Sequence, residues 1–232
     1  KRKRNSSSMN NLNHIAFIMD GNGRWGVKKK NNRNYGHLEG VKIVQKIVEA
    51  SLTFKIPIIT FYVFSSENWK RPKSEINYLF SLIKIYFKKE IKNIIENKIK
   101  INILGRNNKL SSEIRKILIA AARKTRKNSK LIVNLAINYG SKNEIMDSIK
   151  KLNIKSKKIT EKNINRNLYL DLLPPDILIR TGGQKRLSNF MLWQLAYTEI
   201  FFLDKLWPEF TKKDLNNIIK KFHKIKRNFG DV

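Results

Sequence analysis

Short apolar runs alternate with amphipathic stretches along most of this chain. The apolar runs have the length of buried strands and cover residues 15–19, 56–64, 99–103, 131–137, 176–179 and 200–203. The stretches between them space their apolar residues as helices do and cover residues 40–53, 74–97, 110–127, 143–152, 160–170, 189–197 and 214–228. Strands that alternate with helices imply right-handed crossovers, so we predict a single α/β domain with a mostly parallel central sheet of about six strands flanked by helices.

The composition fits one such domain. The chain has 232 residues, of which 41% are hydrophobic, and this is enough for a sizeable core. It has no cysteine and no apolar run as long as a membrane span, so we expect a soluble protein in a reducing, cytoplasmic compartment. Residues 1–13 are basic and polar, and we predict a disordered N-terminal tail there, followed by one folded domain over residues 14–232.

The chain is strongly basic, with 49 basic and 18 acidic residues and a formal net charge of +31. Such a charge suits nucleic acid or an anionic membrane surface, but it is spread along the chain and is mostly lysine, which equally fits solvated faces. Arginine is scarcer and lies beside glycine, aromatic residues or proline at Arg24, Arg33, Arg71, Arg180 and Arg186. The planar guanidinium group of arginine can bind a phosphate through two parallel hydrogen bonds, which the ammonium group of lysine cannot do. These positions therefore predict an oxyanion site.

An apolar run at residues 15–19 ends abruptly in Asp20-Gly21-Asn22-Gly23-Arg24. Gly21 and Gly23 permit positive φ angles, so that backbone N–H groups can form a nest for an anion, with Asp20 beside it to hold a hard cation. This combination suits a metal-bound phosphate. The alternative is an ordinary glycine turn with a solvated acid.

Residues 21–26 also match the G-x-G-x-x-G fingerprint of dinucleotide-binding proteins. That fold requires a helix to open directly on the loop. The residues after Gly26 have no apolar periodicity, so we expect no helix there, and this argues against a dinucleotide-dependent oxidoreductase.

Unusual polar residues follow several of the predicted strands, at Asp20, Ser65, Asn138 and Arg180. The carboxyl ends of parallel strands meet at one edge of a sheet, and ligands of open α/β sheets bind there. We therefore expect these residues to converge on one site. The apolar stripe of the predicted helix 74–97 is either core packing or the wall of a site for an apolar ligand.

With these residues, the chain resembles the cis-prenyltransferase family, and within it the bacterial members that make undecaprenyl diphosphate. The resemblance is carried, in order, by residues 14–25 with Arg33 and His37, 65–72, 138–140, 176–189, 193–202 and 207–208. It implies an enzyme that extends an allylic diphosphate, typically farnesyl diphosphate, with isopentenyl diphosphate units. The new double bonds are cis and the product is a polyprenyl diphosphate such as undecaprenyl diphosphate. It also implies an apolar tunnel between the helix 74–97 and the sheet.

The resemblance implies roles for individual residues. Asp20 would act with Mg²⁺, and Asn68 stands where a proton acceptor is expected, although an uncharged amide is better suited to orientation or relay. Residues implied to hold the allylic diphosphate are Gly21, Asn22, Gly23, Arg24, Arg33 and His37. Residues implied to hold isopentenyl diphosphate are Arg180, Arg186 and Ser188. Further substrate-binding positions are Trp25, Ser65, Ser66, Glu67, Trp69, Arg71 and Leu187. For His37 the alternative is a packing or capping histidine.

Glu199 matches a second metal-contacting carboxylate of the family, or equally forms a structural ion pair. Three positions depart from the family pattern: Gln184 replaces a usual Glu, Lys185 replaces a residue that is His in some members, and Asn228 replaces Arg before Phe229-Gly230. Metal binding near residues 184–185 is therefore in question.

The resemblance implies a homodimer, and the basic surface suggests peripheral contact with an anionic membrane. We expect no nucleic-acid partner. A nucleic-acid-binding protein would need its charge gathered on one face, and a non-catalytic partner subunit of a prenyltransferase need not keep Asp20 and the phosphate-binding arginines. Product length depends on tunnel side chains that the sequence alone does not place.

Overall fold

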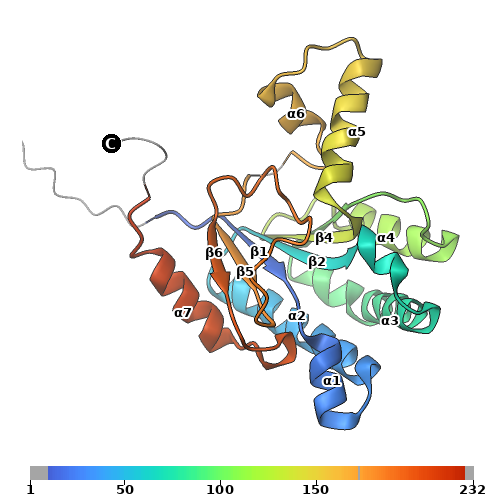
Figure 1. The fold of residues 1–232 in the computed structure, drawn as a ribbon, viewed down its shortest axis with the longest axis vertical. Helices are drawn as coiled ribbons and strands as arrows, with labels where there is room; N and C mark the ends of the chain where they lie inside the picture. Colours follow the sequence, from blue (N-terminus) through green and yellow to red (C-terminus); the bar gives the residue numbers. More distant parts are fainter. Residues whose placement is uncertain (1–9, 172, 228–232) are drawn as a thin grey trace, which may run out of the picture.

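The computed structural model describes residues 10–171 and 173–227. A six-stranded sheet runs through the molecule in the order β3-β4-β2-β1-β5-β6, and every neighbouring pair is parallel (Figure 1). The strands are β1 His14–Ile18, β2 Ile58–Ser65, β3 Ile99–Leu104, β4 Leu131–Tyr139, β5 Ile177–Arg180 and β6 Glu199–Phe202. The predicted α/β class and the parallel six-stranded sheet are confirmed.

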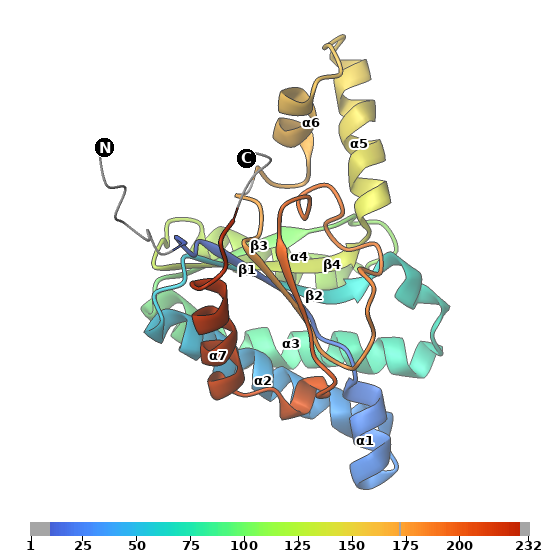
Figure 2. The same cartoon turned by 60° about the vertical axis from the view of Figure 1, so that its left-hand side comes forward.

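Helices cover both faces of this sheet. They are α1 Asn22–Lys30, α2 Arg33–Thr53, α3 Lys73–Glu96, α4 Ser112–Thr125, α5 Ser141–Ile154, α6 Glu161–Asn167 and α7 Lys212–Phe222, with short 3₁₀ turns η1 Ser66–Lys70 and η2 Trp207–Glu209. Figure 2 shows α2, α3 and α7 below the sheet and α5 and α6 above it.

Side chains alternate along β1 and so contribute to two cores. Ile15 and Phe17 belong to the larger core under α2, α3 and α7, whereas Ala16 and Ile18 belong to a smaller core on the other face. The smaller core is closed by Phe190, from the irregular segment between β5 and β6.

A chain of polar side chains, three of them buried and Asn102 half-buried, crosses four strands of the sheet. His14 Nε2 lies 2.7 Å from Thr60 Oγ1, Asn134 donates to the same oxygen at 2.9 Å, and Asn102 donates to Asn134 Oδ1 at 2.9 Å. Burial lowers the pKa of His14 to about 4, so the ring is neutral at neutral pH. Since a strand that slipped by one residue would leave these groups buried and unpaired, the chain of bonds fixes the strand register.

Helix α1 corrects the expectation that no helix follows the first glycine loop. It begins at Asn22, directly after Gly21, whose φ is 104°. Its apolar periodicity is weak because it packs against its neighbour through glycine and not through a stripe of apolar side chains. A Cβ on Gly26 would lie 2.3 Å from the Asn32 carbonyl oxygen and 2.5 Å from the Gly36 nitrogen, so α1 and α2 are in backbone contact there. The third glycine of the fingerprint therefore packs against α2 and not against the strand, unlike the dinucleotide-binding fold.

Two other helix predictions were wrong. Residues 189–197 form turns and not a helix, because Ser188, Asn189 and Met191 all have positive φ angles. Helix α7 ends at Phe222 and not at Asn228, which lies outside the described residues.

The predicted disordered tail, residues 1–13, is ordered in its last four residues. The Asn10 side chain donates to the carbonyl oxygens of Phe222, at the end of α7, and of Ile225, and Asn13 donates its N–H to Asp176. Residues 1–9 lie outside the described part of the chain. Among the residues that the structure describes, no helix is both long and apolar enough to cross a membrane.

Candidate active site

A cavity of about 550 Å³ opens at the carboxyl edge of the sheet, where β1, β2 and β5 end. Its mouth is polar and is lined by Asp20, Gly21, Asn22, Gly23, Arg24, Arg33, His37, Ser65, Asn68, Arg71, Arg180, Arg186 and Ser188. Its deeper part lies between α2, α3 and the sheet and is lined by Val41, Val44, Leu79, Leu82, Ile83, Tyr86, Phe87, Leu135 and Ile137. Most of the predicted site residues are thus brought together around a pocket with one charged and one apolar end.

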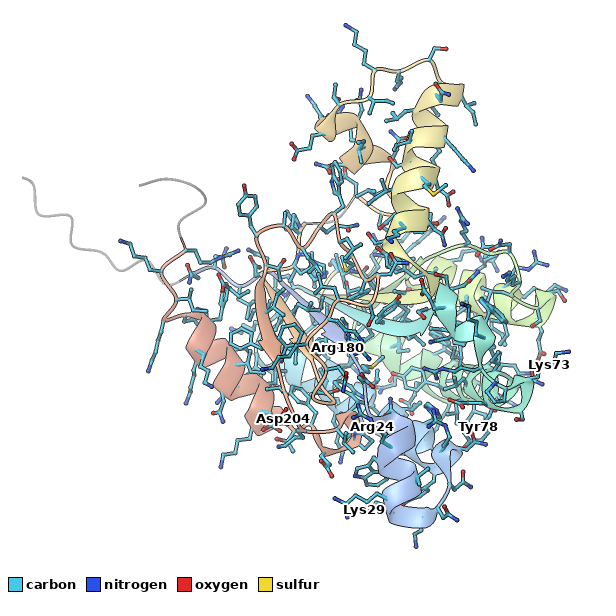
Figure 3. The ribbon with its side chains drawn as sticks, viewed as in Figure 1. Arg24, Lys29, Lys73, Tyr78, Arg180 and Asp204 are labelled. Atoms are coloured by element: carbon cyan, nitrogen blue, oxygen red, sulfur yellow. The ribbon has the colours of Figure 1, made fainter. Side chains whose placement is uncertain are left out.

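Asp20 lines the mouth of the cavity and lies two residues after the end of β1. Its carboxylate accepts hydrogen bonds from Arg180 Nη2 at 2.9 Å and from Arg24 Nη2 at 3.3 Å. The two arginines are labelled in Figure 3. The Thr181 hydroxyl holds the Asp20 backbone by donating to its carbonyl oxygen at 2.8 Å. Asp20 therefore lies where β1, β5 and α1 meet.

Arg180 is the most buried cation of the site, with 4% of its side chain exposed. One terminal nitrogen donates to Ser188 Oγ at 2.8 Å and to the carbonyl oxygen of Arg186, and the other binds Asp20. Its Nε is buried and has no partner among the described residues. A buried donor without an acceptor is costly, so the site suits an anionic ligand at this point.

A second charged cluster gathers around Glu75, in the first turn of α3. Its carboxylate accepts from Arg33 Nε at 3.1 Å, from Arg71 Nη1 at 3.1 Å and from His37 Nε2 at 3.1 Å. Burial raises the pKa of Glu75, but the hydrogen bond from Arg33 and the charges of Arg33 and Arg71 outweigh burial and leave the pKa below its ordinary value. Glu75 is therefore an anion that holds three predicted substrate-binding side chains in place.

Burial lowers the pKa of His37, and the hydrogen bond to Glu75 offsets this only in part. We therefore take the ring as neutral at pH 7, with the hydrogen on Nε2. Sequence reasoning missed Glu75 because an acid in the first turn of a helix is common. The available signal was its position four residues after Arg71, the spacing of an ion pair on a helix.

The wall formed by η1 contributes Ser65 and Asn68 to the cavity. Asn68 Oδ1 accepts a hydrogen bond from the Ser65 backbone nitrogen at 3.1 Å, which fixes the amide. The neighbouring Trp69 does not line the cavity. Its ring packs on Phe64 and Phe80, and its Nε1 donates to Asn138 Oδ1 at 2.8 Å.

Several predicted substrate-binding residues lie behind the cavity wall. Trp25 stacks on Tyr35, with ring centroids 5.6 Å apart, and Leu187 packs on the smaller core. Ser66 donates to Glu67, which also accepts from Asn189 at 2.8 Å and so joins η1 to the loop after β5. The structure gives these residues supporting contacts and no place in the lining of this cavity.

In the loop after β5, Gln184 accepts a hydrogen bond from Arg186 Nη1 at 2.7 Å. The residue that departs from the family pattern thus holds one of the predicted arginines. Neither Gln184 nor Lys185 lines the cavity.

Glu199 lies at the opposite end of the sheet from Asp20. It is the first residue of β6, beside Ile177 at the start of β5, and its carboxylate lies 3.7 Å from Arg227 Nε. Within one chain it cannot share a metal ion with Asp20. This geometry fits the alternative of a structural ion pair. The described residues contain no group of three or more His, Cys, Asp or Glu side chains that could hold a metal ion.

The fold and the site define a parallel α/β protein with a basic, glycine-rich anion site at the mouth of an apolar pocket. This is the combination needed to hold ligands with a charged phosphate end and an apolar body.

Comparison with known proteins agrees with this class. The chain matches the undecaprenyl diphosphate synthase family over residues 18–230 and therefore belongs to this family of prenyltransferases. The isoprenyl transferase of Fusobacterium nucleatum is 42% identical over 94% of this chain and 96% of its own length. The isoprenyl transferase of Rickettsia bellii is 44% identical over 96% of this chain and 99% of its own length. The family resemblance of the sequence is confirmed.

Two solved structures share the fold over nearly the whole chain. A probable undecaprenyl diphosphate synthase from Campylobacter jejuni has a TM-score of 0.84 and 36% identity, covering 96% of this chain and 100% of its own. Lavandulyl diphosphate synthase from Lavandula x intermedia, in complex with dimethylallyl diphosphate, has a TM-score of 0.90 and 27% identity, covering 94% of this chain and 98% of its own.

Proposed function

We propose that this cis-prenyltransferase condenses isopentenyl diphosphate units onto an allylic diphosphate, with farnesyl diphosphate as the primer, to make a polyprenyl diphosphate such as undecaprenyl diphosphate. One observation supports this proposal most strongly. Asp20, Arg24 and Arg180 meet at the mouth of a cavity whose inner part is lined by apolar side chains. Such a cavity holds a diphosphate at one end and a hydrocarbon at the other.

The allylic diphosphate is assigned to the start of α1 and to the Glu75 cluster. The N-terminal N–H groups of α1 point out of the helix and its dipole favours an anion there. Arg33 and His37, both held by Glu75, lie beside that helix end and line the same cavity. The lavandulyl diphosphate synthase structure supports this assignment, because it shares the fold and its ligand is an allylic diphosphate.

Isopentenyl diphosphate is assigned to Arg180, Arg186 and Ser188. Ser188 is bonded to Arg180, whose buried Nε still lacks an acceptor. Three donors from the end of β5 and the loop after it can hold a diphosphate rigidly, and rigid placement of two reactants lowers the barrier of a condensation.

The donor set fits Mg²⁺ that arrives with the diphosphate. Mg²⁺ binds proteins through one or two carboxylates and completes its shell with substrate phosphates and water. Asp20 offers one carboxylate with 30% of its side chain exposed. When bound, the metal supplies charge neutralisation for the leaving diphosphate. The chain's own residues, Arg24 and the N–H groups of α1, bind and orient that same group.

Asn68 is proposed to orient the incoming unit and not to act as its base. Its Oδ1 is already engaged by the Ser65 N–H, and an amide has little basicity. The proton lost in condensation would then pass to a diphosphate oxygen.

We also propose a homodimer that contacts anionic membrane peripherally, in agreement with the basic composition. Light scattering measures the first, and binding to vesicles with and without anionic lipid at rising salt measures the second. Vesicle binding that ignores both lipid charge and salt contradicts the membrane proposal.

The central test is to incubate the protein with farnesyl diphosphate, labelled isopentenyl diphosphate and Mg²⁺, and to size the extracted lipid. We expect a polyprenyl diphosphate from the wild-type chain and none from Asp20→Ala. A folded wild-type chain that yields no product with any divalent metal or allylic primer overturns the proposal in favour of a non-catalytic partner subunit.

A further inference from the structure

A surface groove of about 530 Å³ runs between α3 and α4. Its floor is apolar and is formed by Phe87, Ile91, Ile117, Ala120 and Ala121. A further apolar side chain stands at its rim, where Ile85 is 60% exposed. An apolar groove with a large exposed apolar side chain beside it is typical of a surface that contacts a partner or a membrane.

The rim of the groove is basic. Lys84, Lys88 and Lys124 line it, and the one acid among its lining residues is Glu113. Glu113 pairs with Lys84 at 2.8 Å and so joins α4 to α3. Lys88 and Lys124 have no hydrogen bond or ion pair with any residue that the structure describes. Lys88 belongs to α3 and Lys124 to α4, so each wall of the groove presents an uncompensated positive charge.

An apolar floor between two free ammonium groups is complementary to a ligand that joins an apolar chain to an anionic head group. Anionic phospholipids of a membrane have this chemistry, and lysine can lay its methylene stem on the apolar surface while its ammonium group binds a lipid phosphate. A nucleic acid would use the two charges and leave the apolar floor without a partner.

We propose that this groove is the face by which the protein docks on an anionic membrane. Ile85 enters the apolar layer, and Lys88 and Lys124 bind lipid phosphates. This inference rests on the proposed function, because it locates the membrane contact proposed there.

The position of the groove relative to the active-site cavity agrees with such a docking face. Phe87 lines both the groove and the inner, apolar part of that cavity. The mouth of the cavity lies toward the other end of α3, where Glu75 holds Arg33 and His37. Docking through the groove therefore places the bilayer beside the part of the cavity that suits a hydrocarbon and leaves the diphosphate end toward water.

The first test is binding to vesicles of phosphatidylcholine with and without phosphatidylglycerol. Lys88→Gln/Lys124→Gln removes both free charges, and we expect its partition onto the anionic vesicles to be at least about 10-fold weaker than that of the wild type. The reason is that each lysine at an anionic surface contributes about fivefold.

Lys220→Gln/Lys221→Gln is the matched control, because these exposed lysines lie on α7, on the opposite side of the molecule from α4 (Figure 1). Physiological salt screens charges beyond about 8 Å, so the partition of this control should stay within about twofold of the wild type. Equal losses of binding in the two double variants overturn the inference, because they report net charge and not a face.

The second test locates the lipid directly. The chain contains no cysteine, so a single introduced cysteine can carry a dye whose emission depends on polarity. We expect the dye at Ile85→Cys to shift to shorter wavelength on anionic vesicles. Ile154→Cys, at the end of α5 and 84% exposed, is the control and should show no shift. A shift at position 154 and none at position 85 overturns the inference, because another face then meets the membrane.

Vesicle binding that is the same in Lys88→Gln/Lys124→Gln and the wild type overturns the inference. A change of oligomeric state in this variant, measured by light scattering, also overturns it, because the groove then holds a second copy of the chain. The condensation assay with soluble substrates separates the inference from the proposed function. A wild-type chain without product overturns the proposed function, whereas normal product together with unchanged vesicle binding in the variant overturns the docking face alone.

Discussion

The Asp20 carboxylate lies 2.9 Å from the Arg180 guanidinium, although 160 residues separate the two in the sequence. Strands β1 and β5 are neighbours, and Ile18 pairs with Arg180, so the residue two positions after Ile18 faces the arginine. The sheet thus places the proposed metal carboxylate beside the proposed isopentenyl diphosphate site.

Asp20→Asn keeps the shape of this residue and removes its charge. We expect turnover to fall at least about 100-fold, because the charge that orients two arginines and is proposed to hold the metal is lost. Asp204→Asn is the matched control: Asp204 also lies beside the loop after β5 but does not line the cavity (Figure 3). Steady-state rates over a range of Mg²⁺ concentrations measure the effect, and equal losses in the two variants contradict the assignment.

Glu75→Gln should release Arg33, His37 and Arg71 together. We expect kcat/KM for the allylic diphosphate to fall by about 10- to 100-fold, since small displacements of binding groups have large kinetic effects. The free energy of unfolding should fall by about 1–3 kcal/mol, because donors near a buried carboxylate lose their acceptor. Glu90→Gln is a suitable comparison, since Glu90 is equally buried on the same helix but lies away from the mouth. Unchanged kinetics in a folded Glu75→Gln would refute the holding role.

The buried His14 predicts a pH dependence of stability. An unfolded histidine binds a proton near its ordinary pKa of 6.5, whereas the folded one does so only near 4. Protonation therefore favours the unfolded state, and the contribution to stability is complete above about pH 6.5 and is lost as the pH falls toward 4. The loss should reach about 3 kcal/mol. Denaturant unfolding at several pH values measures it, and His14→Gln should flatten the slope in this range. An equal slope in both proteins contradicts the prediction.

Gly26→Ala should separate α1 from α2, because the new Cβ would meet backbone atoms at 2.3 and 2.5 Å. Overpacking of this kind costs about 1–3 kcal/mol. Since α1 carries Gly23 and Arg24, affinity for the allylic diphosphate should also fall. Val27→Ala, an exposed neighbour on the same helix, should change neither. Calorimetric titration with the diphosphate separates the two variants.

The parallel sheet and its ligand edge were predictable because apolar runs and the polar residues after them are local in the sequence. Asp20 follows β1, Ser65 and Arg180 are the last residues of β2 and β5, and parallel strands bring such positions to one edge. Glu199 is the first residue of its strand and therefore lies at the other end of the sheet. In the sequence, Glu199 stands before its apolar run and Asp20 stands after one, and this difference in order predicts opposite ends of the sheet.

The remaining differences between the predicted and the observed structure arise from tertiary contacts, which a local sequence pattern does not reveal. Helix α1 depends on its glycine contact with α2, so apolar periodicity could not reveal it. The apolar residues of 189–197 have helical composition, but positive φ angles at Ser188, Asn189 and Met191 turn the chain, and Phe190 and Met191 pack into the smaller core. The Glu75 cluster needs the fold of α2 against α3 before its three partners can meet.

Helix α3 carries Glu75 in its first turn and Phe87 twelve residues later, without a break. Glu75 holds Arg33 and His37 at the charged mouth of the cavity, and Phe87 lines its apolar depth. At the rise of an α-helix, the two positions are about 18 Å apart. One continuous helix thus joins the two ends of the cavity, so a tilt of α3 would displace both ends together.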